Sequence, residues 1–209
     1  MTFTLWFMGL PGAGKSTLAK RVENELREQG TNAENLDGDE VRKNIHPDLG
    51  FSKEDRAINN RRTAFVAKLL IRNNIPVITA MITPFRDAQQ RAREIIEDEG
   101  KFLLIYVKCS VDVCAERDPK GLYKKAQAGK IEKFTGVNHP FQEPLNPDIV
   151  VDTAEDDVET CTDHIMTRLQ KEDVLEETLN GDYDFDVTAQ EKTEIKQHLI
   201  NMGYLEQDE

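Results

Sequence analysis

The sequence predicts an α/β fold in which helices cover both faces of a parallel sheet, and two observations carry this prediction. Short apolar runs bounded by turn residues recur at residues 3–8, 75–81, 102–107 and 149–151, with a shorter run that ends at Leu36. Helical patterns lie between these runs, at residues 15–29, 52–73, 85–98 and 111–117. Apolar strands that alternate with helices are typical of a parallel sheet with both faces covered. Ser52, three residues before Asp55, is expected to be an N-cap.

The charge of the chain is distributed unevenly between a nearly neutral N-terminal part and an acidic C-terminal part. The 209 residues are enough for one domain with an appendage. Residues 1–151 hold 23 Lys and Arg against 21 Asp and Glu, whereas residues 152–209 hold 4 against 18. We therefore expect a globular domain over residues 1–170 and an acidic C-terminal extension over residues 171–209. The acidic end argues against general nucleic-acid binding.

The same composition predicts a cytoplasmic protein. The three cysteines form no CxxC pair, and the N-terminus has no basic region ahead of its short apolar run. No apolar segment approaches the ~18 residues that a membrane span needs, so we expect no membrane association. Within the extension, Ile195, Leu199 and Met202 make a helical apolar stripe, which more often packs on its own core than on a partner.

Residues 9–16 read GLPGAGKS, which matches the phosphate-binding pattern G-x-x-x-x-G-K-[ST] between a strand and a helix. Glycines let backbone N–H groups converge on phosphate oxygens, and the helix N-terminus adds its positive dipole. Lys15 is expected to reach the β- and γ-phosphates of ATP, and Ser16 to offer its hydroxyl to Mg²⁺. The fold is therefore expected to be that of a P-loop nucleoside-triphosphate hydrolase. The expected nucleotide-binding residues are Gly12, Ala13, Gly14, Lys15, Ser16 and Thr17.

Two aspartates, Asp37 and Asp39, follow the short run ending at Leu36, in the stretch LDGDEVR. This position lies at the carboxyl edge of the predicted sheet, where open α/β sheets bind ligands. A carboxylate there can accept a proton from an attacking hydroxyl or hold Mg²⁺ through water. Asp-Gly is also a common turn pair, so the stretch alone leaves a solvated turn open as the alternative.

Three further stretches contain residues suited to an anionic nucleotide. In LGFSKEDRAINNRR, Arg56 and Asn59 share a helix face, and with Arg62 they could bind an anion, although the spacing alone favours an ordinary charged face. The stretch DPKGLYKKAQAG reads as a mobile basic segment that could close over phosphates. In EKFTGVNHPF, Phe134 could stack on a base or only fill a loop.

Together, these stretches resemble adenylylsulfate kinases, which phosphorylate the 3′-hydroxyl of adenosine 5′-phosphosulfate (APS) with ATP. The resemblance covers about residues 3–153 and is carried by GLPGAGKST, LDGDEVR, LGFSKEDRAINNRR, VITAMITPFRDAQQRARE, VCAERDPKGLYKKAQAG and KFTGVNHPF. The loop motif alone is common to many enzymes, whereas the order and joint presence of the others are specific. The resemblance implies ATP and Mg²⁺, a homodimer and a role in sulfate assimilation.

The resemblance also implies roles for single residues. Asp39 and Lys15 would be catalytic, with Asp39 serving the acceptor hydroxyl. Arg117 is similar to the lid arginine near the ATP adenine. The APS-binding residues would be Asp39, Arg42, Phe51, Arg56, Asn59, Ile82, Thr83, Lys120 and Phe134. Among these, Phe51 and Phe134 would sandwich the adenine, and Arg42 would bind the phosphosulfate.

One departure from the family pattern concerns Thr83. The family reads Ile-Ser-Pro after its third strand, with a serine that becomes phosphorylated in some members, and this chain reads Ile82-Thr83-Pro84. A threonine keeps the hydroxyl but is stiffer at χ1. We therefore do not expect an obligatory phosphoserine role, while main-chain contacts from Ile82 and Thr83 to the substrate could persist.

Two alternative functions remain open at this point. A kinase of the same fold for another nucleotide-like acceptor would keep the loop but should lose the paired phenylalanines, or Arg56 and Asn59. A non-catalytic nucleotide-binding regulator would be expected to lose Lys15 or Asp39. All of these residues are present in the sequence.

Overall fold

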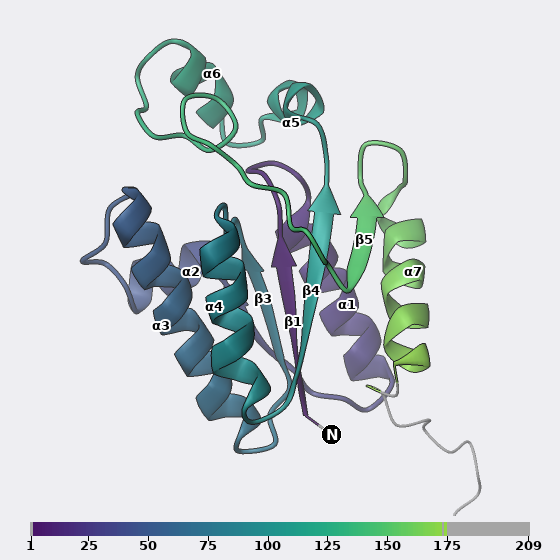
Figure 1. Ribbon diagram of the computed structural model, residues 1–209. Helices are drawn as coiled ribbons and strands as arrows, with labels where there is room; N and C mark the ends of the chain where they lie inside the picture. Colours follow the sequence, from purple (N-terminus) through teal and green to yellow (C-terminus); the bar gives the residue numbers. More distant parts are fainter. Residues whose placement is uncertain (1, 173, 175–209) are drawn as a thin grey trace, which may run out of the picture. The chain divides into compact units, whose positions relative to one another are not determined.

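The computed structural model describes residues 2–172 and residue 174, and these form a parallel sheet between two layers of helices (Figure 1). The strands are β1 (Phe3–Met8), β2 (Glu34–Asp37), β3 (Val77–Met81), β4 (Lys101–Lys108) and β5 (Ile149–Asp152), in the order β2-β3-β1-β4-β5 with every neighbouring pair parallel. The helices are α1 (Lys15–Glu28), α2 (Gly38–Asn44), α3 (Lys53–Ile71), α4 (Arg86–Glu97), α5 (Val111–Arg117), α6 (Leu122–Gln127) and α7 (Val158–Lys171). The predicted fold class is confirmed.

Strand β1 lies in the centre of the sheet, and its side chains alternate between two hydrophobic cores. Phe3, Leu5 and Phe7 pack with α1 and α7 on one face. Trp6 and Met8 pack with α3 and α4 on the other face. Figure 1 shows these two pairs of helices on opposite sides of the sheet. A strand that is buried on both faces is apolar throughout, which is why residues 3–8 form a continuous apolar run.

The predicted elements are present with small changes at their ends. Strand β3 begins at Val77 rather than at residue 75, because Pro76 has no N–H to donate to a strand ladder, and its carbonyl accepts a hydrogen bond from Glu34 N at 2.8 Å. Helix α3 begins after the predicted N-cap. The hydroxyl of Ser52 accepts a hydrogen bond from Asp55 N at 3.0 Å, and the Asp55 carboxylate accepts one from Ser52 N, which completes a capping box.

Helices α2 and α7 have no counterpart among the helical patterns of the sequence. Helix α2 begins at Gly38, inside the Asp-Gly pair that also reads as a turn. Helix α7 follows β5, is N-capped by Asp157 and packs on α1. The predicted stripe of Ile195, Leu199 and Met202 lies outside the described residues.

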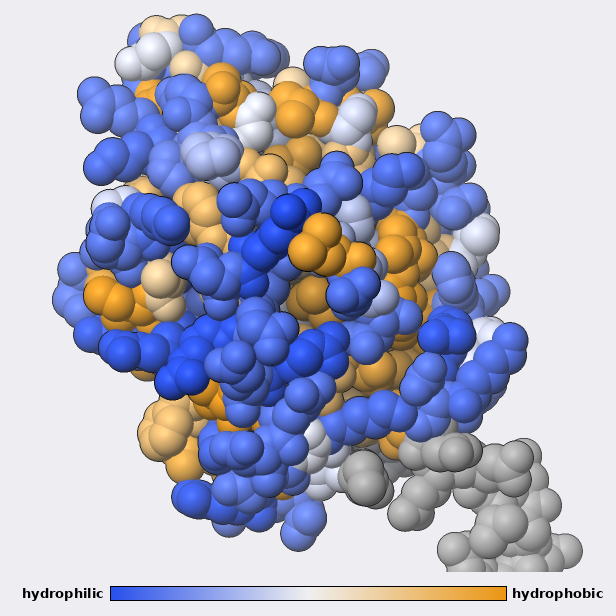
Figure 2. All heavy atoms as spheres, in the orientation of Figure 1, coloured by the Kyte–Doolittle hydropathy of each residue, from blue (hydrophilic) through white to orange (hydrophobic). Residues whose placement is uncertain are grey.

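The carboxyl ends of the strands lie at one edge of the sheet, and a long segment crosses above them. Between β4 and β5 the chain passes through α5 and α6, which Figure 1 shows above the strand ends. We call residues 118–141 the lid. In Figure 2, hydrophilic residues cover much of α3 and α4, hydrophilic and hydrophobic residues are mixed around α5 and α6, and hydrophobic residues gather near β4 and β5. Within residues 2–172 and 174, no helix combines the length and the apolar character that crossing a membrane requires.

Candidate active site

The phosphate-binding loop, residues 9–16, joins β1 to α1 at the carboxyl edge of the sheet. Gly14 is the N-cap of α1 with a φ of 93°, a left-handed conformation that strains any residue with a side chain. Lys15 is buried, and its Nζ donates a hydrogen bond to Leu10 O at 2.6 Å. Burial lowers the pKa of Lys15 to about 8, although nearby acidic groups oppose this effect. An anionic phosphate in the loop would therefore stabilise the charged form of Lys15.

Asp37 ends β2 and connects the phosphate-binding loop to α2. Its Oδ2 accepts a hydrogen bond from Ser16 Oγ at 2.7 Å. Its Oδ1 accepts one from Asp39 N at 2.9 Å, which makes Asp37 the N-cap of α2. A Cβ on Gly38 would lie 2.9 Å from Ala80 O, so glycine is the residue that fits between the two aspartates. The oxygens of Ser16 and Asp37 are hard ligands of the kind that Mg²⁺ prefers, so the residues present fit this ion.

Asp39 faces the lid. Its carboxylate forms an ion pair with the ammonium group of Lys120, 81 residues further along the chain. Both side chains are exposed, so solvent and salt weaken their attraction and the pair can open. The two aspartates of LDGDEVR therefore point to different partners: Asp37 to the phosphate-binding loop and Asp39 to the lid.

Arg42 and Arg56 bring two positive charges to an exposed aromatic ring. The Arg42 guanidinium lies 4.7 Å from the centroid of Phe51 and donates a hydrogen bond to Gly50 O at 2.7 Å. Arg56 donates to Phe51 O at 3.1 Å and to Lys133 O at 2.9 Å. Burial lowers the pKa of both guanidinium groups, but arginine remains charged. Carbonyl oxygens do not neutralise this charge, so the pair is suited to an anion.

The two predicted adenine-binding phenylalanines differ in exposure. Phe51 is 57% exposed and presents its ring to solvent. Phe134 is 8% exposed and packs edge-on against Tyr123, with the ring centroids 4.9 Å apart. Arg56 holds the two segments together, because it donates to carbonyl groups at Phe51 and at Lys133. The structure thus presents one ring to a ligand and covers most of the other.

The buried face of α3 is polar in the half of the helix nearest to this site. Asn59 is buried one turn after Arg56, and its Oδ1 lies 2.9 Å from His46 Nδ1. Further along the helix the buried face becomes apolar. The buried polar residues are Arg56, Asn59, Asn60 and Thr63, and the buried apolar ones are Ala64, Ala67 and Ile71. Buried polar groups are rarely without a specific partner, and here the partners of Arg56, Asn59 and Thr63 lie within the protein, so this half of α3 forms a polar layer beside the site.

Residues 82–84 form the turn after β3. Thr83 has a φ of 42°, which is strained for a β-branched residue, and its side chain is buried, whereas Ile82 is half-buried. The Thr83 hydroxyl accepts a hydrogen bond from Trp6 Nε1 at 2.9 Å, and its carbonyl accepts one from Gln89 Nε2 at 3.2 Å. The hydroxyl group therefore faces the core.

Arg117 ends α5 and contacts the chain just after β5. Its guanidinium donates hydrogen bonds to the carbonyl of Thr153 and, at 3.2 Å, to its hydroxyl. The same hydroxyl donates to Ala13 O at 2.9 Å. Thr153 thus links the end of α5, just before the lid, to the phosphate-binding loop. The sequence prediction does not include Thr153, because a lone threonine after an apolar run matches no binding motif.

The predicted nucleotide-binding residues gather at the loop. Gly12 and Ala13 lie in it, and Ser16 and Thr17 are exposed in the first turn of α1. Asp39, Arg42, Arg56 and Lys120 lie on the side of β2, α3 and the lid. The structure therefore places the loop beside a basic, partly aromatic surface.

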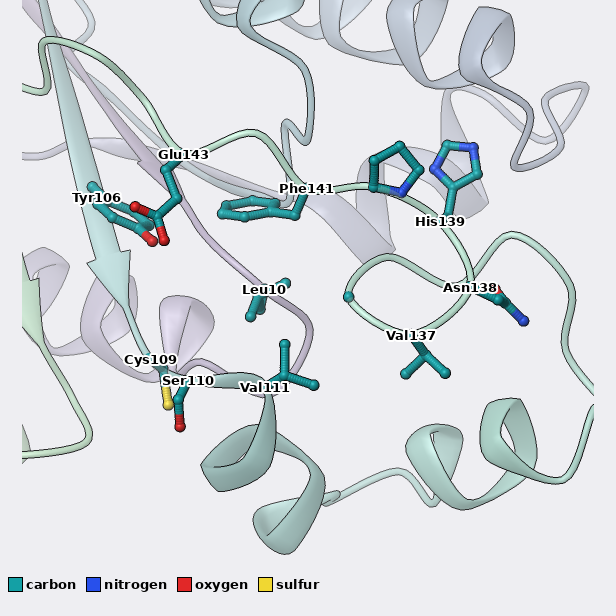
Figure 3. Close-up of a pocket in the computed structure, with 12 residues that line it drawn as sticks. Leu10, Tyr106, Cys109, Ser110, Val111, Val137, Asn138, His139, Phe141 and Glu143 are labelled. Carbon is teal, nitrogen blue, oxygen red and sulfur yellow. The ribbon is translucent and has the colours of Figure 1, made fainter.

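A cavity of about 580 Å³ adjoins the loop, between the end of β4 and the lid (Figure 3). In Figure 3, Tyr106 and Glu143 point toward one another. Burial, together with the Glu143 carboxylate, raises the pKa of the Tyr106 phenol. The lining includes Leu10, Tyr106, Val111, Val137, Phe141 and Glu143. None of the predicted site residues lines this cavity, although part of its lining, residues 136–141, belongs to the quoted stretch KFTGVNHPF.

The strand order β2-β3-β1-β4-β5, the phosphate-binding loop with its buried lysine, and the basic surface beside the loop together define a P-loop kinase. The family model described as adenylylsulphate kinase matches residues 1–152. The chain belongs to the adenylylsulphate kinase family, which confirms the resemblance seen in the sequence.

Individual relatives agree with this assignment. The adenylyl-sulfate kinase of Halothermothrix orenii is 48% identical over 168 residues, which is 80% of this chain and 89% of that protein. The probable adenylyl-sulfate kinase of Bacillus subtilis is 48% identical over 162 residues, 78% of this chain and 82% of that protein. The structure of the Mycobacterium tuberculosis APS kinase CysC in complex with AMPPNP and APS matches with a TM-score of 0.78 at 39% identity, covering 81% of this chain and 98% of that chain.

Proposed function

We propose that this chain transfers the γ-phosphoryl group of ATP to the 3′-hydroxyl of adenosine 5′-phosphosulfate, giving ADP and 3′-phosphoadenylyl sulfate. The observation that carries the proposal is the position of Asp39. Its main chain is bonded to Asp37, which contacts Ser16 of the phosphate-binding loop, and its side chain is bonded to Lys120 of the lid. A carboxylate between a phosphate site and a closing segment can meet an acceptor hydroxyl.

The donor half of the site consists of the loop and the residues next to it. The loop backbone and the Lys15 ammonium group bind the phosphates of ATP. Ser16 and Asp37 would hold Mg²⁺, which supplies further positive charge to the β- and γ-phosphates when it is bound. Arg117, held by Thr153, lies at the lid side of this half and would contact the ATP adenine.

The acceptor half is the surface of α2, α3 and the lid. Arg42, which is half-buried, and Arg56, which is buried, would bind the phosphosulfate. Both guanidinium groups donate to carbonyl oxygens, which carry no full negative charge and leave the positive charges for an anion. Phe51 and Phe134 hold the adenine, which requires the lid to present more of Phe134 than the free protein does. Asn59 and the main chain of Ile82 and Thr83 would complete the contacts.

Transfer would then proceed without a covalent enzyme intermediate. Lys120 leaves Asp39 for the anionic substrate, and the freed carboxylate accepts the proton of the 3′-hydroxyl. The new bond joins that oxygen to the γ-phosphorus as the bond to ADP breaks. The protein contributes positioning and positive charge, which are the main sources of catalysis in phosphoryl transfer.

We also propose that the protein is a cytoplasmic homodimer of sulfate assimilation, in which residues 171–209 form an acidic extension that the reaction does not need. Cys109, Cys114 and Cys161 are free and buried, which fits a reducing compartment. Helix α7 ends at Lys171, where the proposed extension begins. Light scattering after size exclusion tests the homodimer, which should have twice the 23.8 kDa mass of the chain.

An acceptor panel tests the reaction. Purified protein is incubated with MgATP and with APS, AMP or a nucleoside diphosphate, and ADP release is followed. We expect ADP release that depends on APS. Release with another acceptor but not with APS would favour a different kinase of the same fold. MgATP binding without release for any acceptor would favour a regulator.

A further inference from the structure

His46 lies between α2 and α3 and is almost completely buried, with 1% of its surface exposed. Its Nδ1 lies 2.9 Å from Oδ1 of Asn59. An amide oxygen can only accept a hydrogen bond, so Nδ1 must carry the hydrogen and donate it. The backbone of His46 is fixed as well, because its N–H donates to Val41 O at 3.1 Å and its carbonyl accepts from Leu49 N at 3.2 Å.

The second ring nitrogen of His46 lacks a partner. Nε2 is buried and forms no hydrogen bond with any of the described residues, 2–172 and 174. With the hydrogen on Nδ1, this nitrogen is a buried acceptor, which destabilises the folded state. A leucine would fill the same space without this cost. Packing alone therefore does not account for a histidine here, whereas its hydrogen bond to Asn59 does.

The orientation of the Asn59 amide decides what it offers to a ligand. Asn59 is buried on α3 one turn after Arg56, which contacts the carbonyl groups of Phe51 and Lys133. The oxygen and the NH₂ group lie on opposite edges of one planar amide, so an oxygen held by His46 leaves two N–H donors for another partner. The phosphosulfate and the ring nitrogens of APS are hydrogen-bond acceptors, which need donors.

We infer that His46 is a positioning residue, which fixes the Asn59 amide with its NH₂ group toward the acceptor substrate. The inference rests on the proposed function, because it places Asn59 in the acceptor site. His46 itself need not touch the substrate. Its effect should therefore appear in the affinity for APS and leave the affinity for MgATP unchanged.

Three substitutions separate this role from packing. His46→Asn keeps an N–H donor at the position of Nδ1 and removes the unpartnered Nε2. His46→Asp has nearly the same shape as His46→Asn but offers only acceptors. It therefore repels the Asn59 oxygen and favours the opposite orientation of the Asn59 amide, with the NH₂ group toward residue 46. His46→Leu removes the donor and keeps the packing. The asparagine variant is thus the rescue control for the other two.

Steady-state kinetics with full-length protein measure the effect. We expect His46→Asp and His46→Leu to raise the KM for APS by about tenfold, as for the loss of one hydrogen bond to a charged group. The kcat and the KM for MgATP should stay near wild type, and His46→Asn should keep the KM for APS within about threefold. Unchanged KM for APS in His46→Asp would overturn the inference. The inference would also be overturned if all three variants, His46→Asn included, raised the KM for both APS and MgATP in proportion to their loss of Tm. That result would indicate that His46 acts through packing alone.

A second measurement is independent of the reaction. Nitrogen-15 NMR of the histidine rings, with the His46→Asn variant to assign the signal, reports which nitrogen carries the hydrogen. We expect the hydrogen of His46 on Nδ1, and finding it on Nε2 would overturn the inference for any substrate. Wild-type protein that releases no ADP with APS would refute the proposed function instead, and the two failures are therefore distinguishable.

Discussion

The phosphate-binding loop and the lid border the same site, but different kinds of contact hold them in place. The loop depends on local backbone geometry, such as the left-handed Gly14, and on the buried Lys15, which donates a hydrogen bond to Leu10 O. The lid depends on side chains that reach across the molecule, such as Lys120 to Asp39 and Tyr123 Oη to Pro11 O at 2.9 Å. The contacts that hold the loop therefore come from within the loop, whereas those that hold the lid come from distant parts of the chain.

The strongest test of this comparison changes the residue where the two regions meet. Asp39→Asn keeps the shape of the side chain but removes its charge and basicity. We expect kcat to fall by about 10²–10⁴-fold, the usual range for a positioned general base. The KM for MgATP should change little, because the loop and Lys15 hold the phosphates.

Asp37→Asn is the matched control. Asp37 accepts a hydrogen bond from Ser16 of the phosphate-binding loop. Replacing its carboxylate by an amide should therefore weaken MgATP binding more than it lowers kcat. The opposite pattern, with near-normal kcat and weak MgATP binding in Asp39→Asn, would make Asp39 a metal-site residue. The hydroxyl would then be activated by position alone.

The pH dependence of MgATP binding sharpens the account of the loop. Burial lowers the pKa of Lys15 to about 8, so the charged form that binds phosphate is lost as the pH rises through this value. Between about pH 7.5 and 9, the charged fraction in the free protein falls roughly eightfold, and the Kd for MgATP should rise by about the same factor. Isothermal titration calorimetry measures this change. Lys15→Met should bind more weakly at every pH and show no such rise, and a constant Kd for wild type would contradict the account.

The turn after β3 should affect stability more than activity. Thr83→Ala removes the acceptor of the buried Trp6 N–H, which should lower the free energy of unfolding by about 1–3 kcal/mol in urea titrations. Most activity should remain, because transfer needs no covalent enzyme intermediate. Thr83→Ser keeps the hydroxyl and should keep the stability. A kcat loss above ~100-fold, or ~2.7 kcal/mol, in folded Thr83→Ala would assign the hydroxyl a chemical role.

The smallest effect is expected from removing the acidic extension. A chain that ends at residue 174 keeps the Glu172 carbonyl, which accepts a hydrogen bond from Lys101 Nζ at 2.6 Å, and the buried Val174. Its kcat and Tm should stay near those of the full chain. A chain that ends at residue 171 loses both contacts and should be active but less stable, by about 1.5–3 kcal/mol for the valine alone. An inactive or insoluble chain of 174 residues would place part of the extension in the core or in the site.

The difference between the two regions also decides what the sequence could predict. The loop and β1 are set by adjacent residues, so residues 3–8 and GLPGAGKS predict both their position and their geometry. The Asp-Gly pair at the start of α2 is compatible with a turn or a helix start, and in the structure it starts the helix, with Asp37 as the N-cap that accepts a hydrogen bond from Asp39 N. Local pattern is therefore sufficient for the loop but ambiguous for α2.

The acceptor half could be predicted only in part. The spacing of Arg56 and Asn59 places them on one helix face, but it does not reveal their partners. Arg56 contacts the carbonyl of Lys133 at a separation of 77 residues, and Asn59 contacts His46 at a separation of 13. Such contacts depend on how the lid and the loop before α3 fold back, which no short motif encodes.

The position of the transferred phosphate tests the central claim most directly. The wild-type protein is incubated with MgATP and APS, and the product is analysed by phosphorus-31 NMR together with ADP release. The account predicts one ADP for each molecule of product, with the new phosphate on the 3′-oxygen and the phosphosulfate intact. ADP release without a phosphorylated product, or a phosphate on any other oxygen, would contradict it.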